Sequence, residues 1–344
     1  MGEMQELPRA FEIKGKVESV SDTTKKIRFG ILGTGWMADI FAKELALSED
    51  ATLTAVASST PGRAASFSNV HSAARPFDSY EALIAWEGID IVYIATTTER
   101  HLENAMTCID HGRPMLVEKP LTLCADDTRK VVAAAKARGL FCMEAMWMRC
   151  FPQIRDLEAV LAPIGPVQKL EASFCIDIPF DPTHRLYNPD LGGGALLDIG
   201  IYPLNLVHRL WGFENAEMSF RLEWAKSGVD EAGVITFDYS DGRHAALDYS
   251  LKGQRPHRAR FHGQTGTVTI ENFFHPSKII VALGDGTIAE EAFSYPVMGY
   301  QYEIDEVVRS IKTGRLESAL VPHRTAIEIA EMMDRILLLG KRRQ

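Results

Sequence analysis

An apolar run that leads directly into a glycine-rich turn constrains the fold of this chain more than any other feature. Residues 27–32, IRFGIL, are typical of a buried strand, and GTGWMA follows at 33–38. Apolar residues then recur at helical spacing from Met37 to Leu45, and residues 53–57 again indicate a strand. This order of strand, turn, helix and strand predicts a βαβ unit with parallel strands.

The same alternation continues through the first part of the chain. Two further helices are predicted at 99–110 and 121–139. Further strands are predicted at 89–95, 114–117 and 140–144. Strands that alternate with helices predict an α/β Rossmann domain with a doubly wound parallel sheet, which we place at residues 26–147, after an N-terminal extension at 1–25.

The pattern changes in the second part, residues 148–344. The expected strands are longer, alternate apolar with polar residues, and are joined by hairpin-like turns at 239–243 and 263–266. Helical periodicity returns at 302–312 and 323–339. We therefore predict an α+β substrate-binding and oligomerisation domain with a large, open, mostly antiparallel sheet, whose terminal helices pack back toward the Rossmann domain.

Charge and composition narrow the class of function. The formal net charge of −9 disfavours a nucleic-acid partner, and no apolar stretch is long and uninterrupted enough to span a membrane. The five cysteines are scattered without CxxC spacing, and the histidines form no dense cluster, so we predict no metal. An odd number of cysteines and the lack of a secretory signal favour a cytoplasmic protein.

The turn at 33–38 fits the pattern GxGxxA. Gly33 permits the tight turn, Gly35 lets a pyrophosphate approach the backbone, and Ala38 permits close helix packing. The following helix would direct its free N–H groups at the phosphates. A tight turn alone also requires glycine, but the strand, helix and strand around this turn favour a dinucleotide site. The candidate cofactor contacts here are Gly33, Thr34, Gly35, Trp36 and Met37.

The end of the second strand indicates which dinucleotide is preferred. NAD sites usually have an acidic residue there, whereas this chain has Ser58, Ser59 and Arg63, and no acidic residue before Asp78. Hydroxyl groups and a guanidinium suit a 2′-phosphate, so we predict NADP(H) in preference to NAD(H). The alternative is that Arg63 is only a surface residue of the next helix.

Lys119 follows the strand at 114–117, within the sequence Glu118-Lys119-Pro120. Ligands of open α/β sheets bind at the carboxyl ends of the strands, so this lysine is placed to reach a substrate. Glu118 would orient its ammonium group, and Pro120 fixes the direction of the chain beyond it. An ordinary loop lysine is the alternative.

A third motif begins with three glycines at 192–194, which imply close approach of the backbone. Asp198 and Tyr202 follow on an expected helix, four residues apart and therefore on one face, where both can contact one small molecule. Pro203 favours a short and constrained segment. The alternative is a helix N-terminus with a buried tyrosine.

Together these three motifs resemble the Gfo/Idh/MocA family of sugar and polyol oxidoreductases, over residues 27–339. Tyr202, where many members have histidine, and the segment at 144–149 look most like the branch of dimeric dihydrodiol dehydrogenases and NADP-dependent D-xylose dehydrogenases. Residues 96–98, Thr-Thr-Thr, depart from the Thr-Pro-Asn type of loop that is usual in the family.

The resemblance implies NAD(P)-dependent hydride transfer at a CH–OH carbon of a sugar, polyol or cyclic diol. Tyr202 would shuttle the proton, Lys119 would offset the cost of ionising it, and Asp198 would orient a substrate hydroxyl or Lys119. The resemblance also places cofactor contacts at Thr96, His101, Glu118 and Lys119. Trp147 and Arg149 are candidate substrate contacts beside Asp198 and Tyr202, although Trp147 equally suits a core position at the domain junction.

Two alternatives remain open for the function. One is a sensor or scaffold that binds the nucleotide without catalysis, which an intact set of Lys119, Asp198 and Tyr202 disfavours. The other is an enzyme that reduces a nucleotide sugar or a tetrapyrrole product, although no basic patch is evident to hold a second diphosphate. As in the family, the second-domain sheet is expected to form a homodimer or a homotetramer.

Overall fold

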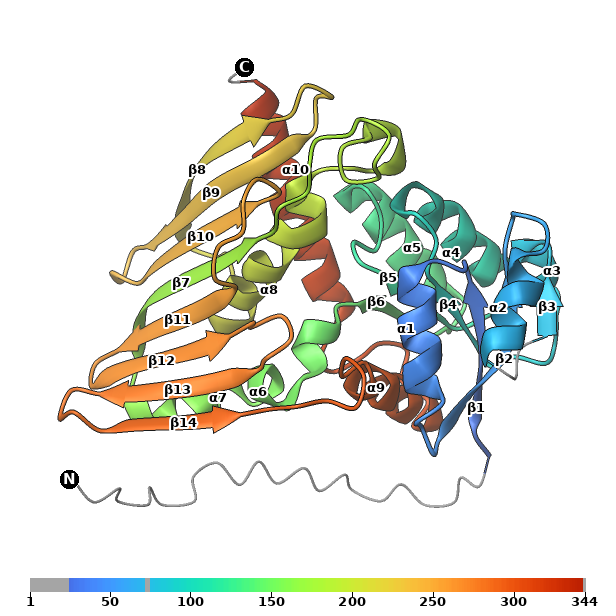
Figure 1. Ribbon diagram of the computed structural model, residues 1–344, viewed down its shortest axis with the longest axis horizontal. Coiled ribbons are helices and arrows are strands. Elements are labelled where there is room, and N and C mark those ends of the chain that lie inside the picture. Colours follow the sequence, from blue (N-terminus) through green and yellow to red (C-terminus); the bar gives the residue numbers. More distant parts are fainter. Residues whose placement is uncertain (1–24, 72–74, 343–344) are drawn as a thin grey trace.

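The computed structural model describes residues 25–71 and 75–342, and it contains two sheets (Figure 1). The first sheet has six parallel strands in the order β3-β2-β1-β4-β5-β6. Its strands are β1 (Ile27–Leu32), β2 (Ala51–Ala57), β3 (Arg75–Phe77), β4 (Ile91–Ile94), β5 (Met115–Glu118) and β6 (Cys142–Ala145). Its helices are α1 (Trp36–Leu45), α2 (Arg63–His71), α3 (Tyr80–Ala85), α4 (His101–Asp110) and α5 (Ala125–Ala137), with a short 3₁₀ turn η1 (Thr98–Arg100) before α4.

The predicted doubly wound sheet is therefore confirmed. Every residue of β4, β5 and β6 is buried, because helices cover both faces of the sheet. The strand order reverses between β1 and β4, and the crevice beyond the carboxyl ends of these two strands is the usual ligand position in such sheets. Of the predicted extension at 1–25, only Lys25 lies within the described residues.

The second sheet has eight strands in the order β14-β13-β12-β11-β7-β10-β9-β8. All neighbours are antiparallel except β7 and β10, which confirms the predicted mostly antiparallel sheet. The strands are β7 (Val167–Cys175), β8 (Ala216–Trp224), β9 (Asp230–Tyr239), β10 (His244–Ser250), β11 (Arg258–Gly263), β12 (Gly266–Glu271), β13 (Lys278–Leu283) and β14 (Ile288–Ala292). The predicted hairpins at 239–243 and 263–266 join β9 to β10 and β11 to β12.

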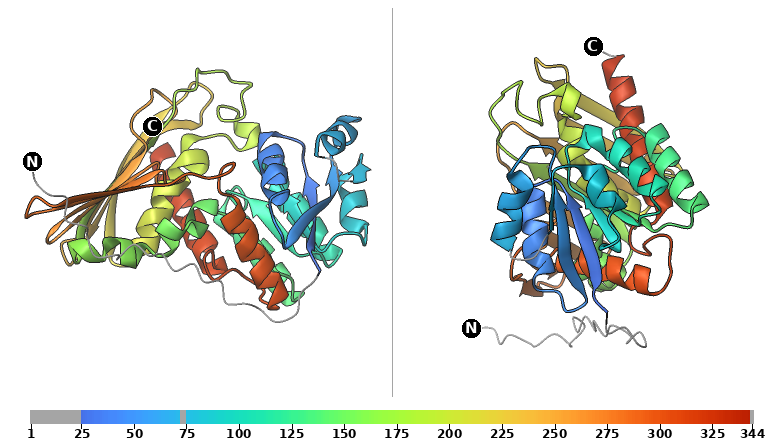
Figure 2. Two further views of the ribbon diagram at one scale, coloured as in Figure 1. Left: turned by 60° about the horizontal axis from the view of Figure 1, so that its bottom comes forward. Right: turned by 90° about the vertical axis from the view of Figure 1, so that its right-hand side faces the viewer.

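Helices cover one face of this second sheet, the face directed toward the first domain, and leave the other uncovered (Figure 2). The helices of this part of the chain are α6 (Pro152–Arg155), α7 (Leu157–Leu161), α8 (Ile201–Leu210), α9 (Gln301–Lys312) and α10 (His323–Lys341). Shorter turns are η2 (Trp147–Cys150), η3 (Ala162–Ile164) and η4 (Pro189–Leu191), and a π-helical turn, η5 (Leu196–Gly200), leads into α8. The predicted assembly through the uncovered face stays a prediction.

Hydrogen bonds of two carboxylates, Glu44 and Asp334, join the two parts of the chain. Glu44 of α1 accepts hydrogen bonds from the backbone N–H groups of residues 298–300, at 2.6, 2.7 and 3.2 Å, just before α9. Asp334 of α10 accepts the N–H of Ala125 at the start of α5, at 2.8 Å. The terminal helices therefore pack against the first domain and bring residues near position 300 to the crevice, while the exact domain boundary between residues 147 and 148 stays a prediction.

Within residues 25–71 and 75–342, no helix is long and apolar enough to cross a membrane. The cytoplasmic location stays a prediction.

Candidate active site

A pocket of about 480 Å³ lies where the sequence places the ligand, beyond the carboxyl ends of β1, β4 and β5. One wall consists of the β1–α1 turn and the loop after β4, and the opposite wall is formed by η5, α8 and residues of the second sheet. Its lining includes Gly35, Trp36, Met37, Thr96, His101, Glu118, Lys119, Trp147, Asp198 and Tyr202. The structure thus brings most of the predicted site residues together around one cavity.

The β1–α1 turn is shaped to receive a phosphate. Gly33 has φ +105°, and a Cβ there would lie 2.5 Å from the carbonyl oxygen of Ala95, so only glycine fits. A Cβ on Gly35 would meet nothing within 4 Å, and Gly35 gives α1 no side-chain cap, so the first N–H groups of the helix are free to donate. Thr34 and the exposed Trp36 flank this opening. The turn therefore fits the pyrophosphate of a dinucleotide.

The end of β2 contains the predicted 2′-phosphate contacts. Ser58 is buried, and its Oγ accepts the N–H of Thr60 at 3.1 Å, so this hydroxyl shapes the turn. Ser59 and Arg63 are exposed, and an Arg63 Nη2 lies 3.5 Å from the carbonyl oxygen of Thr34. The Arg63 guanidinium thus reaches from the start of α2 across to the β1–α1 turn.

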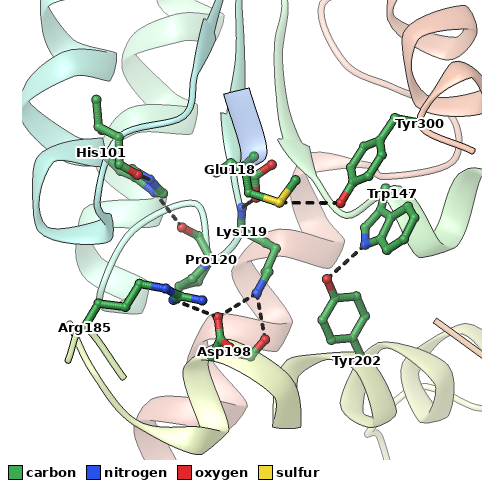
Figure 3. Close-up of polar contacts among 11 residues, drawn as sticks. His101, Glu118, Lys119, Pro120, Trp147, Arg185, Asp198, Tyr202 and Tyr300 are labelled. Atoms are coloured by element: carbon green, nitrogen blue, oxygen red, sulfur yellow. Dashed lines mark hydrogen bonds and ion pairs between the residues drawn. The ribbon is translucent and has the colours of Figure 1, made fainter. Parts of the chain in front are cut away.

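His101 is buried beneath the pocket and links two loops. Its Nδ1 lies 2.9 Å from the carbonyl oxygen of Pro120, and its Nε2 lies 3.2 Å from that of Thr96. Burial lowers the pKa of His101, so the neutral ring donates one hydrogen bond and contacts the other carbonyl. The Thr96 hydroxyl accepts a hydrogen bond from Asn104 at 3.1 Å. His101 therefore supports the segment that carries Lys119 (Figure 3).

Glu118 does not orient the Lys119 ammonium, contrary to the sequence prediction. Its Oε1 accepts the hydroxyl of Tyr93 at 2.5 Å, and its Oε2 accepts the backbone N–H of Lys119 at 3.1 Å. Burial raises the pKa of Glu118, which these hydrogen bonds partly oppose. Glu118 therefore fixes the backbone of Lys119, and neither of the two hydrogen bonds of the Lys119 ammonium goes to it.

Asp198 holds the Lys119 ammonium instead. Lys119 Nζ donates to the carbonyl oxygen of Asp198 at 2.7 Å and to its Oδ1 at 3.0 Å. The side chains of Lys119 and Asp198 are 14% and 16% exposed. Arg185 Nη1 donates to the same Oδ1 at 3.1 Å (Figure 3). Burial raises the pKa of Asp198, but the two cations outweigh it and lower this pKa to about 2. Burial lowers the pKa of Lys119, and Asp198 reverses that effect, so the net pKa is raised.

Tyr202 is a buried phenol beside this ion pair. Lys119 Nζ lies 5.3 Å from its ring centroid, and the indole N–H of Trp147 donates to its hydroxyl at 2.9 Å. Burial outweighs both groups and raises the pKa of Tyr202 to about 12, so ionising it at pH 7 costs about 7 kcal/mol. Lys119 therefore offsets only part of this cost, less than the sequence prediction expects, because burial raises the pKa of Tyr202 by more than the nearby ammonium lowers it.

Asp198 and Tyr202 face the pocket from one segment, as predicted, although a π-helical turn carries the first and α8 carries the second. The three preceding glycines serve close packing. A Cβ on Gly192 would lie 2.3 Å from Leu123, and a Cβ on Gly193 would lie 2.8 Å from three backbone carbonyl oxygens. Pro203 is the third residue of α8, which continues directly from η5, so it has no backbone N–H to donate to the turn before it.

Arg149 is not a pocket residue, contrary to the sequence prediction. Its guanidinium is buried, and it donates to the carbonyl oxygen of Leu320 at 2.9 Å and to Asn205 at 3.2 and 3.3 Å. The 3₁₀ turn η2 directs Arg149 away from the pocket and Trp147 into it. Burial lowers the pKa of Arg149 to about 10, and its role is to join η2, α8 and the segment before α10.

Sequence reasoning missed four residues that complete the pocket: Arg185, Phe174, Phe274 and Tyr300. Phe174 of β7 and Phe274 after β12 stack with their ring centroids 4.0 Å apart, and together they form an apolar wall. None of the four belongs to a local motif, since each reaches the pocket only through the sheet or a long loop. Among the described residues, no group of three or more His, Cys, Asp or Glu side chains could hold a metal ion.

Comparisons with known proteins agree with this geometry. Residues 27–146 match the model described as "Oxidoreductase family, NAD-binding Rossmann fold", and residues 162–269 match the GFO/IDH/MocA C-terminal domain. The scyllo-inositol 2-dehydrogenase (NADP(+)) of Bacillus subtilis (strain 168) is 32% identical, over 90% of this chain and 95% of that protein. The trans-1,2-dihydrobenzene-1,2-diol dehydrogenase of Mus musculus is 29% identical, over 90% of this chain and 95% of that protein.

A solved structure shares the whole fold. KijD10, a 3-ketoreductase from Actinomadura kijaniata crystallised with NADP and TDP-benzene, superimposes with a TM-score of 0.82 at 25% identity, over 92% of this chain and 98% of that one. The family models, the similar proteins and the two-sheet architecture all lead to one assignment. The chain belongs to the Gfo/Idh/MocA family of oxidoreductases, and its first domain is an NAD(P)-binding Rossmann domain.

Proposed function

We propose that this protein is an NADP-preferring dehydrogenase that acts on a CH–OH carbon of a sugar, polyol or cyclic diol. The observation that carries the proposal is the convergence of Lys119, Asp198 and Tyr202 on one pocket, beside a turn open to a dinucleotide. A proton donor, a fixed cation and a cofactor turn around one cavity are the parts that carbonyl reduction and alcohol oxidation require.

The cofactor supplies hydride chemistry when bound, accepting or donating a hydride at its nicotinamide ring. In this chain the β1–α1 turn would hold the pyrophosphate, and Ser59 with Arg63 would hold the 2′-phosphate. The inositol dehydrogenase is named as an NADP(+) enzyme, and KijD10 was crystallised with NADP, which supports this preference.

Proton transfer belongs to Tyr202. With a pKa raised to about 12, its hydroxyl is protonated at neutral pH and suited to donate to a developing alkoxide. Lys119 has three N–H donors, of which Asp198 takes two, so the third can donate to the same substrate oxygen. Asp198 keeps that ammonium charged and fixed in place.

The walls of the pocket favour a ring that is apolar on one face and hydroxylated at its edge. The stacked Phe174 and Phe274 suit the C–H face of a sugar or cyclic diol. Arg185 is 56% exposed, and within the described residues it donates only to Asp198, so its other N–H groups can bind a hydroxyl away from the reacting carbon. The names of the similar proteins, an inositol dehydrogenase and a dihydrodiol dehydrogenase, support this class of substrate.

Steady-state kinetics with inositols, aldoses and dihydrodiols in the presence of NADP test the proposal. Tyr202→Phe and Lys119→Ala are expected to lower kcat by about 100-fold or more. Both should leave the NADPH dissociation constant within about threefold, because neither change alters the phosphate turn. Tyr80→Phe and Lys130→Ala, outside the pocket, are the matched controls. Unchanged turnover in Tyr202→Phe would remove the tyrosine from the mechanism, and NADPH binding without turnover of any substrate would favour the non-catalytic alternative.

A further inference from the structure

The Tyr202 hydroxyl has a hydrogen-bond partner outside the three residues of the proposed chemistry. The indole Nε1 of Trp147 lies 2.9 Å from that oxygen, and the two side chains are 4% and 6% exposed. An indole can only donate, so the tyrosine oxygen is the acceptor and its own hydrogen points elsewhere. No other described residue accepts that hydrogen, which leaves it free to point toward a substrate oxygen in the pocket.

The indole itself cannot easily turn away. It stacks flat on Tyr300, with ring centroids 4.2 Å apart and planes at 1°, and it meets the edge of Phe151 at 5.3 Å. Tyr300 is fixed in turn, since its backbone N–H donates to the buried Glu44 of α1 at 3.2 Å. The Tyr300 hydroxyl also donates to the Met37 sulfur in the cofactor turn, at 3.7 Å (Figure 3). A continuous packed path thus leads from the cofactor turn to the Tyr202 hydroxyl.

This hydrogen bond also distinguishes the two ionisation states of Tyr202. A donor interacts more strongly with a phenolate than with a neutral phenol, so Trp147 lowers the pKa of Tyr202, which burial raises overall. Lys119 also favours the phenolate, and its charge lowers the pKa of Tyr202 more than Trp147 does, but the ammonium is hydrogen-bonded to Asp198 and lies 5.3 Å from the centre of the ring. Among the described residues, Trp147 alone donates a hydrogen bond directly to the tyrosine oxygen.

We infer that Trp147 is a positioning residue for proton transfer: its indole N–H aims the Tyr202 hydroxyl into the pocket and stabilises the oxygen once the proton has left. The inference rests on the proposed function, because Trp147 acts through Tyr202. In the reduction direction the substrate carbon receives a hydride from NADPH, the Tyr202 O–H bond breaks and an O–H bond forms on the substrate oxygen. The Trp147 N–H bond stays intact, and Tyr202 regains its proton from solvent.

Trp147→Phe tests this, since it keeps an aromatic ring against Tyr300 and removes the N–H. In the oxidation direction, kcat/KM rises with pH as Tyr202 loses its proton, and we expect this rise to occur about one pH unit higher in the variant. At pH 7, on the acidic side of the rise, this shift corresponds to about tenfold lower kcat. KM and the NADPH dissociation constant should stay within about threefold. Trp211→Phe, which changes a tryptophan outside the pocket, should leave the profile unchanged. Trp147→Met, a flexible replacement without a donor, is the second variant and should give the same shift.

The double variant Trp147→Phe/Tyr202→Phe separates a positioning role from a structural one. If Trp147 acts through Tyr202, its removal has no further effect once the hydroxyl is gone. A further loss of turnover in the double variant, or a pH profile unchanged in both single variants at Trp147, overturns the inference and leaves the proposed function intact. Full activity of Tyr202→Phe overturns both.

Discussion

Replacing Asp198 with asparagine separates the charge of this residue from its shape. The backbone carbonyl oxygen of Asp198, which accepts from Lys119 Nζ at 2.7 Å, is retained, while the carboxylate that binds Lys119 and Arg185 at 3.0 and 3.1 Å becomes neutral. The two cations then face each other across the pocket without an intervening anion. We therefore expect Asp198→Asn to weaken the hold on Lys119 without displacing the segment.

The size of the effect follows from the acidity of Asp198. Its pKa falls from 3.8 to about 2 in the folded protein, which equals about 2.5 kcal/mol in favour of the ionised form. This net value already includes the cost of burying the carboxylate, so the two cations together contribute more than it, and a share of about 1.4 kcal/mol for Lys119 corresponds to about tenfold in an equilibrium. Because the folded pKa of Asp198 is below its usual value, this stabilisation is present at neutral pH and is lost only in acid, between about pH 4 and pH 2.

The same substitution has a second consequence at alkaline pH. Burial and the nearby Arg185 both lower the pKa of Lys119, and Asp198 is the group that reverses them. In Asp198→Asn the pKa of Lys119 falls, so the lysine loses its charge at a lower pH than in the wild type. We expect kcat/KM to fall about tenfold at pH 7, and the loss to deepen as the pH rises toward 9.

The assay is the pH dependence of kcat/KM for both proteins, with NADPH binding and the free energy of unfolding in urea measured alongside. The unfolding free energy of Asp198→Asn should fall by about 2.5 kcal/mol at pH 7. Asp190→Asn, an exposed acid on η4, is the matched control and should change neither quantity. A pH profile that is merely scaled down, with no steeper alkaline loss, would refute the idea that Asp198 keeps Lys119 charged.

Two further expectations concern the cofactor and the glycine motif. Titration followed by tryptophan fluorescence should show that NADPH binds at least tenfold more tightly than NADH. Arg63→Gln should remove most of that difference while the affinity for NADH stays the same. A wild-type preference for NADH would contradict the 2′-phosphate argument. Gly193→Ala brings a Cβ to 2.8 Å from three backbone carbonyl oxygens and should lower the free energy of unfolding by about 1–3 kcal/mol. The control is Gly284→Ala, whose Cβ would meet a single atom at 3.5 Å and which should cost less than about 1 kcal/mol. Equal costs in the two variants would show that the loop at Gly193 simply moves aside.

The sequence by itself determined the features that depend on local geometry. The order of residues predicts the tight turn at Gly33, which has φ +105°, and the place of Lys119 directly after a parallel strand. Both can be predicted because turn geometry and strand periodicity act over a few positions. Asp198 and Tyr202, four residues apart, share a face for the same reason. The two-sheet architecture and the position of the pocket could be predicted from these local signals.

The contacts between distant segments were decided only by the tertiary structure. Whether Glu118 or Asp198 binds Lys119 depends on where β5 ends and how η5 lies against it, 79 residues further along the chain. Arg149 and Trp147 are two positions apart, yet the turn η2 sends one into a buried hydrogen-bonded cluster and the other to the Tyr202 hydroxyl. The pKa of Tyr202 likewise depends on its burial, which is a property of the assembled core and has no counterpart in a stretch of sequence.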